Sequence, residues 1–201
     1  MNIAVIFAGG VGKRMGETEK PKQFMEIANK PIIIHTLEIF EKSNNIDAII
    51  VSCLKGWIDY LKQLLEKYNI HKVKYVVEGG TSGQMSIFNG IKVAYEEFPK
   101  DSIVLIHDGV RPFIDEDLIN KNIENTKERG SSISSVYSTE TFMIIDENKT
   151  VIEIPDRSKS LIAKAPQTFV LEDIYNIHLR AQNDGIFESI DSATLMKKYN
   201  M

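Results

Sequence analysis

The chain has 201 residues and a mass of 22.8 kDa, with 24 Lys and Arg against 28 Asp and Glu, which gives a net charge of −4. Hydrophobic residues make up 43% and charged residues 26%, the proportions of an ordinary globular protein. The mild acidity argues against a binder of duplex nucleic acid, and no apolar run approaches the ~18 residues of a membrane span.

Neither targeting nor metal chemistry is indicated by the N-terminus, the cysteine or the histidines. Residues 1–7 lack a basic region and run into glycines, so they do not form a signal peptide. The single cysteine, Cys53, excludes an intrachain disulfide and a multi-cysteine metal site, and it is interpreted as an inert small apolar residue. His35, His71 and His178 show no ligand spacing and are interpreted as structural or surface residues. A cytoplasmic location is the simplest interpretation.

Strands and helices alternate over the first 130 residues. The apolar pattern predicts strands at 2–8, 47–53, 72–77 and 102–107. It predicts helices at 31–43, with Pro31 at the first helical position, at 57–68, at 87–98 and at 115–129 before Gly130. Such alternation predicts an α/β fold, a Rossmann-like three-layer sandwich with a mostly parallel central sheet.

The alternation then breaks. Three short β-prone pieces at 131–136, 141–146 and 150–154 lack long helices between them, and 147–149 is a plausible hairpin turn. This stretch forms either an antiparallel edge of the sheet or an arm that leaves it. Helices at 171–183 and 192–199 close the chain.

A glycine-rich loop with several cations follows the first predicted strand. The dinucleotide fingerprint fails because Met15 stands where Gly or Ala is required, and a P-loop fails because Arg14 follows Gly12-Lys13. Backbone N–H groups in such a loop can face an anion, so phosphate binding is favoured over a plain strand-to-helix turn. The residues concerned are Gly9, Gly10, Gly12, Lys13, Arg14, Lys20 and Lys22.

Asp108 ends the fourth predicted strand, and Arg111 follows three residues later. A carboxylate at this position suits Mg²⁺, which is commonly held by one or two carboxylates plus phosphate oxygens. The alternative is a turn-forming aspartate before Gly109. Arg157 lies in a polar stretch beside the β-prone pieces, where a solvent-exposed arginine is the simpler interpretation.

Taken together, segments 8–16, 21–24, 31–40, 79–90, 107–113 and 165–169 resemble the cytidylyltransferases that act on polyol phosphates. The resemblance covers essentially the whole chain and implies transfer of a cytidylyl group from CTP to a polyol phosphate, with Mg²⁺ and release of pyrophosphate. Segments such as Asp108-Gly109-Val110 resemble the ribitol 5-phosphate branch more closely than the methylerythritol phosphate branch of isoprenoid synthesis, which stays the alternative.

The resemblance also implies a role for individual residues. Arg14 and Lys22 match catalytic cations. Asp108 matches a residue that binds metal and substrate, and Arg111 matches a substrate contact. Thr141 and Arg157 match residues that reach the substrate from a dimer partner's β-arm. The positions that match the nucleotide site are Ala8, Gly9, Gly10, Gly12, Gly80 and Ser86.

The expected organisation is a single nucleotidyltransferase domain over 1–201, with a dimerisation β-arm at about 131–164 and no nucleic-acid or membrane partner. Gly83 departs from relatives that carry an arginine there. Relatives also continue into an Asn-x-Lys-x-Thr-like segment, which this sequence does not reach before Met201. Two rival hypotheses are therefore kept: a nucleotide-binding homologue with impaired turnover, and a Rossmann oxidoreductase, which Met15 disfavours.

Overall fold

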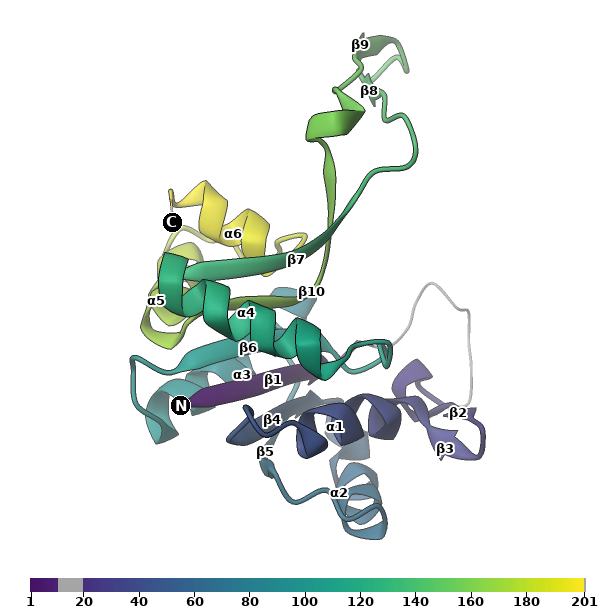
Figure 1. Ribbon diagram of the computed structural model, residues 1–201, viewed down its shortest axis with the longest axis vertical. Coiled ribbons are helices and arrows are strands. Elements are labelled where there is room, and N and C mark those ends of the chain that lie inside the picture. The colour runs from purple at the N-terminus through teal and green to yellow at the C-terminus, as the bar shows by residue number, and fades with distance from the viewer. Residues whose placement is uncertain (11–19, 201) are drawn as a thin grey trace.

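A six-stranded sheet forms the centre of the computed structural model, which describes residues 1–10 and 20–200 (Figure 1). β10 alone runs in the direction opposite to the other five strands, so the prediction of a mostly parallel sheet is confirmed. In spatial order the strands are β5 (Val73–Glu78), β4 (Ala48–Cys53), β1 (Asn2–Ala8), β6 (Ile103–Asp108), β10 (Leu161–Val170) and β7 (Ser131–Tyr137).

Helices cover both faces of this sheet, as expected for a three-layer sandwich. Because side chains alternate along a strand, Ala4 and Ile6 of β1 enter one core while Ile3 and Val5 enter the other. The first core is closed by α1 (Ile32–Lys42), α2 (Ile58–Lys67) and α4 (Glu116–Arg129). The second core is closed by α3 (Gly83–Glu97), α5 (Leu171–Asn183) and α6 (Ser192–Lys198).

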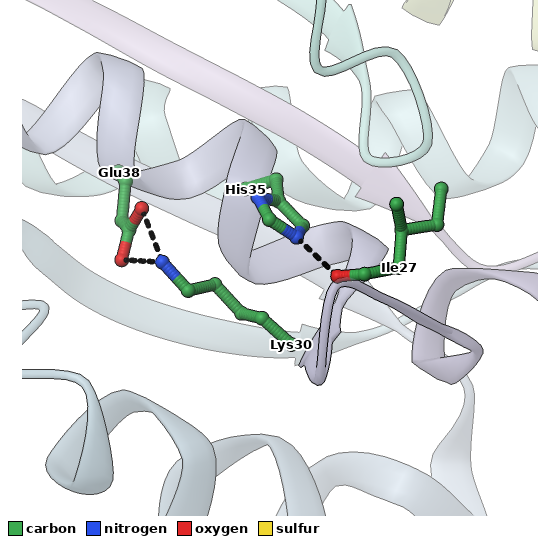
Figure 2. A network of polar contacts seen from close by, with 4 residues as sticks. All are labelled: Ile27, Lys30, His35 and Glu38. Atoms are coloured by element: carbon green, nitrogen blue, oxygen red, sulfur yellow. Dashed lines mark hydrogen bonds and ion pairs between the residues drawn. The ribbon is translucent and has the colours of Figure 1, made fainter.

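A small hairpin of β2 (Glu26–Ile27) and β3 (Lys30–Pro31) packs on α1. Figure 2 shows its two anchors: the Lys30 ammonium lies 2.7 and 2.9 Å from the Glu38 carboxylate oxygens, and His35 Nε2 lies 2.9 Å from the Ile27 carbonyl oxygen. A carbonyl only accepts, so Nε2 of His35 carries the donated hydrogen. Pro31 ends β3 and precedes α1, which corrects its predicted place as the first helical residue.

The strand β10 was not predicted. Its sequence carries Pro166, which cannot donate to a neighbouring strand, and its pairing with β7 shifts register between Ala163 and Gln167. The peptide bond between Ala165 and Pro166 is cis. Because β10 pairs with both β6 and β7, the 131–136 piece becomes the edge strand of the main sheet.

Residues 138–160, called the arm below, project from the sheet beyond the ends of β7 and β10 (Figure 1). The arm carries the hairpin β8 (Ile144–Ile145) and β9 (Val151–Glu153), and a short 3₁₀ helix, η4 (Arg157–Lys159). The Asp146 carboxylate accepts from the backbone N–H groups of Asn148 and Thr150, so the predicted turn at 147–149 is confirmed. The stretch after Gly130 is thus both a sheet edge and an arm.

No helix in the described ranges is long and apolar enough to cross a membrane. Cys53 ends β4 with no exposed surface, and burial raises the pKa of its thiol to about 12, which confirms its interpretation as an inert core residue.

His178 is a buried imidazole in the core between α3 and α5. Its ring stacks on Phe88 with centroids 5.6 Å apart, and within the described residues neither ring nitrogen has a hydrogen-bond partner. Burial lowers the pKa of His178 to about 4. The folded protein therefore holds this ring neutral at pH values where the unfolded chain protonates it.

We predict that His178 makes the protein less stable as the pH falls from 6.5 towards 4. Below pH 6.5 the His178 ring binds a proton in the unfolded chain but stays neutral in the folded protein. This residue should therefore lower the unfolding free energy by about 2 kcal/mol between pH 7 and 5. Urea unfolding of the wild type and of His178→Leu at several pH values measures the difference. The difference between the two unfolding free energies should be constant above pH 7 and should change as the pH falls from 7 to 5. A difference that stays constant down to pH 5 would contradict the prediction.

Candidate functional site

The loop after β1 and the turn after β5 touch each other at the carboxyl end of β4. A Cβ atom built on Gly9 would lie 3.2 Å from Gly79 Cα and 2.6 Å from Ser86 Oγ, so only glycine fits. The Gly79 N–H donates to the carbonyl of Cys53, the last residue of β4, at 2.7 Å. Two segments far apart in sequence therefore form one continuous backbone surface, where ligands of open parallel sheets bind.

Ser86 holds the second of these segments in place. Its hydroxyl accepts from the Gly80 N–H at 3.0 Å and donates to the Ser82 carbonyl at 2.9 Å. The first turn of α3 is capped by Ser82, whose hydroxyl accepts from the Met85 N–H. Ser86 is thus adjacent to both Gly80 and Gly9.

Gln23 fixes the backbone on which Ala8 and Gly10 lie, a role that sequence reasoning missed. Its side-chain amide is buried and donates to the Ala8 carbonyl at 2.6 Å and to the Gly10 carbonyl at 3.4 Å. Lys22 precedes it on the 3₁₀ helix η2 (Lys22–Phe24) and is exposed. Phe24 follows it and is fully buried.

The Phe24 ring anchors η2 in the apolar core. It stacks on Trp57, which ends η3 (Lys55–Trp57), with centroids 4.9 Å apart, and meets Tyr60 edge-on. The predicted core role of Trp57 is confirmed by this contact. With Gln23 and Phe24 both fixed, the exposed Lys22 is carried by rigid backbone at the carboxyl edge of the sheet.

Asp108 and Arg111 form an ion pair at the end of β6. Arg111 Nε lies 2.6 Å from Asp108 Oδ2, with the arginine about half exposed and the aspartate mostly buried. His107 Nε2 lies 3.0 Å from the Arg111 carbonyl oxygen, and burial lowers the pKa of His107, so a neutral ring donates that hydrogen bond. The turn that carries Arg111 is therefore tied back to the strand.

A pocket of about 410 Å³ lies beside this ion pair. Asp108, Arg111 and Lys164 contribute charged groups to its lining, and Gln84 and His178 contribute buried side chains from α3 and α5. Its size is that of an ordinary small-molecule site. Lys164 lies on the unpredicted strand β10, which is why the sequence pattern did not identify it.

Gln167 and Asp191 close one side of the pocket and were also missed. Gln167 Nε2 donates to Asp191 Oδ2 at 2.9 Å, and Gln167 Oε1 accepts from the Ala193 N–H at 2.9 Å. Burial alone would raise the pKa of Asp191, but hydrogen bonds from Thr194 and Gln167 outweigh it and lower that pKa. The signal available in the sequence was an aspartate at the start of a helix, whose carboxylate caps α6 through the Thr194 N–H.

Thr141 and Arg157, which the resemblance assigns to the substrate, are not at this edge. Thr141 and Arg157 are exposed on the arm, and the Arg157 guanidinium donates to the Thr139 carbonyl at 3.2 Å. Neither residue lines the pocket of this subunit. Gly12 and Arg14 lie outside the described residues. Within residues 1–10 and 20–200, no group of three His, Cys, Asp or Glu side chains is placed to hold a metal ion.

Comparison with known proteins identifies the family. Residues 2–200 match the family model described as "IspD: 2-C-methyl-D-erythritol 4-phosphate cytidylyltransferase". The ribitol-5-phosphate cytidylyltransferase of Vibrio parahaemolyticus is 55% identical over 199 residues, which cover 99% of this chain and 84% of that protein. The enzyme of the same name from Streptococcus agalactiae serotype Ia is 52% identical over 200 residues, again covering 84% of its length.

Some more distant relatives are named for methylerythritol, and one of them has a solved structure. A 2-C-methyl-D-erythritol 4-phosphate cytidylyltransferase from Chloroherpeton thalassium is 38% identical, and the alignment covers 98% of this chain and 83% of that protein. The crystal structure of 4-diphosphocytidyl-2C-methyl-D-erythritol synthase from Anaerococcus prevotii superposes with a TM-score of 0.83 at 30% identity, covering 99% of this chain and 82% of that one. The chain therefore belongs to the IspD family of cytidylyltransferases.

Proposed function

We propose that this protein transfers a cytidylyl group from CTP to ribitol 5-phosphate, giving CDP-ribitol and pyrophosphate. The observation that carries the choice of acceptor is that the relatives at 51–55% identity are named for ribitol 5-phosphate. At 38% identity, relatives named for either acceptor occur. The glycine surface at Gly9 and Gly79 and the adjoining pocket supply separate places for a nucleotide and an acceptor.

The reaction needs charge neutralisation more than proton transfer. A phosphate oxygen of the acceptor attacks the α-phosphorus of CTP, a new P–O bond forms, and the bond to the bridging oxygen of pyrophosphate breaks. The second pKa of a phosphate monoester lies near ~6, so the nucleophile is ionised at pH 7 without a general base. Repulsion between the two anions is the barrier that fixed cations and N–H groups must lower.

Lys22 and Arg14 are the cations that we assign to this task. Lys22 is exposed at the edge of the sheet on backbone that Gln23 and Phe24 hold rigid, so it can meet developing charge with little reorganisation. Gly9, Gly10, Gly12, Gly80 and Ser86 form the nucleotide site in this proposal. Asp108 and Arg111 bind the acceptor at the mouth of the pocket.

Mg²⁺ fits the Asp108 position. The carboxylate is partly exposed at a strand end beside the pocket, and Mg²⁺ commonly takes one or two carboxylates together with phosphate oxygens. When bound, the ion would neutralise part of the charge of the triphosphate. Arg111 contacts Asp108 through Nε, so the other N–H groups of its guanidinium remain available to an acceptor hydroxyl or phosphate oxygen.

A homodimer completes the site in this proposal. The arm and the adjoining strand ends expose apolar side chains such as Tyr137 (73%), Ile152 (64%) and Ile154 (59%), a patch that favours contact with another protein surface. We assign that surface to a second copy, whose pocket would receive Thr141 and Arg157. The relative exposure of these two residues on a projecting arm is what supports the assignment.

The function itself is tested by pyrophosphate release from CTP with ribitol, arabinitol, glycerol and methylerythritol phosphates as acceptors. We expect turnover with ribitol 5-phosphate to exceed that with every other acceptor by at least about tenfold in kcat/KM. Preference for methylerythritol phosphate would establish the alternative branch. Binding of CTP without pyrophosphate release from any acceptor would establish the impaired homologue instead.

We predict that Lys22→Ala lowers kcat by about 10²- to 10³-fold and changes the KM for CTP only a few-fold, because the ammonium acts mainly on transition-state charge. Steady-state kinetics measure both constants. Lys92→Ala serves as the control, since it removes one positive charge from an exposed pair with Glu96 on α3. A Lys22→Ala enzyme as active as the control would remove Lys22 from the catalytic machinery.

Arg157→Ala should mainly raise the KM for the acceptor. If the arm crosses to the partner, mixing and reassembling Arg157→Ala with Lys22→Ala subunits creates heterodimers with one intact site. With the acceptor far below the raised KM of Arg157→Ala, both parent enzymes are nearly inactive, and random reassembly should restore about a quarter of wild-type activity per subunit. A mixture that is no more active than the average of its two parents would show that Arg157 serves its own subunit's site.

A further inference from the structure

The segment 184–191, called the α5–α6 loop below, forms part of the pocket wall. Ser189, Ile190 and Asp191 line the pocket together with Asp108 and Arg111. Ile186 packs against the core, but Phe187 is half exposed and Ile190 is 93% exposed. Apolar burial therefore does not fix the middle of this loop, and its position depends on hydrogen bonds.

Two side chains at the start of α3 provide those hydrogen bonds. The Ser82 hydroxyl donates to the Phe187 carbonyl at 2.6 Å, and Gln84 Nε2 donates to the Ile186 carbonyl at 2.9 Å. Ser82 and Gln84 follow the Gly79–Gly80 turn directly. The Ser82 carbonyl also accepts from Ser86, whose hydroxyl in turn accepts from the Gly80 N–H.

The other end of the loop is attached to the sheet. Gln167 of β10 bonds both Asp191 and the Ala193 N–H, and in the sheet register it lies opposite Ile106 of β6. Ile106 stands two residues before Asp108. The α5–α6 loop thus spans from the turn assigned to the nucleotide to the strand that carries the acceptor ion pair.

We propose that Ser82 and Gln84 are positioning residues that couple the nucleotide turn to the acceptor pocket. Nucleotide bound at Gly80 and Ser86 restricts the motion of the first turn of α3. Through the two hydrogen bonds it also restricts the motion of the α5–α6 loop. An acceptor then meets a wall whose conformational freedom has already been reduced, so it binds more tightly. The inference rests on the proposed function because it takes CTP as the ligand of the Gly79–Gly80 turn.

The side chain of Gln84 allows the hydrogen bond to be removed without damaging the core. Within the described residues its Oε1 is buried and has no hydrogen-bond partner, so Gln84→Met removes an unsatisfied acceptor together with the donor. Ser82→Gly removes the hydroxyl while keeping a residue that is tolerated at a helix N-cap, and Ser82→Thr keeps both the hydroxyl and the cap. Gln182→Met is the matched control, since its amide donates to the His178 carbonyl and not to the loop.

We expect Gln84→Met and Ser82→Gly each to raise the KM for ribitol 5-phosphate about fivefold and the double variant at least tenfold, while the Kd of CTP measured without acceptor changes less than threefold. Ser82→Thr and Gln182→Met should behave as the wild type. A structural defect alone would lower the melting temperature and the amount of active enzyme without separating the acceptor KM from the Kd of CTP. Equal changes in the acceptor KM and in the Kd of CTP measured without acceptor, or no change in either, would overturn the proposal.

Hydrogen exchange gives a second readout that does not require turnover. Adding CTP alone should slow amide exchange in residues 184–191 of the wild type and of Gln182→Met, and leave it unchanged in the double variant. CTP binding, seen as a raised melting temperature, without slower exchange in the wild-type loop would overturn the coupling but not the proposed function. Absence of any CTP binding would overturn the proposed function, and the coupling with it.

Discussion

The close approach of Gly9 and Gly79 is the constraint on which the rest of the site depends. The loops after β1 and β5 belong to strands that are separated by β4, and they meet only because β4 ends at Cys53 and neither loop carries a Cβ at the contact. A side chain at Gly9 would collide with Ser86 and displace the hydroxyl that holds Gly80. Backbone geometry, rather than any single polar side chain, therefore sets where a ligand can lie.

This constraint also explains why the polar residues around it are mostly uncharged and buried. Gln23, Ser86 and Gln167 each hydrogen-bond two backbone or capping groups of one neighbouring segment. An amide or a hydroxyl can donate and accept at once, so it joins two segments without the desolvation cost of a buried charge. The charged residues Lys22 and Arg111 are left exposed, which leaves them available for phosphate groups despite a net charge of −4 on the whole chain.

The sequence predicted the parts of the fold that arise from local periodicity. Strands such as 2–8 and helices such as 115–129 with Gly130 at the end carry their own signals, and the structure confirms them. The strand β10 carries no such signal, because Pro166 and the register shift interrupt its pattern. Ser82, Gln84 and Gln167 were missed because their partners are backbone atoms or helix caps distant in sequence, which no spacing rule connects.

Thr141 and Arg157 raise a different problem. The sequence identified them by resemblance, and the structure places them on the arm, outside the residues that line this subunit's pocket. The arm has apolar side chains but no core of its own, because β8 and β9 form a two-stranded hairpin that is exposed along its length. A hairpin of this kind is marginally stable in water unless something packs on it. A partner that covers the apolar side chains would stabilise the hairpin and also bring Arg157 to a second pocket. One contact would then provide both packing for the hairpin and a further cation for the pocket, so assembly and substrate binding would depend on the same surface.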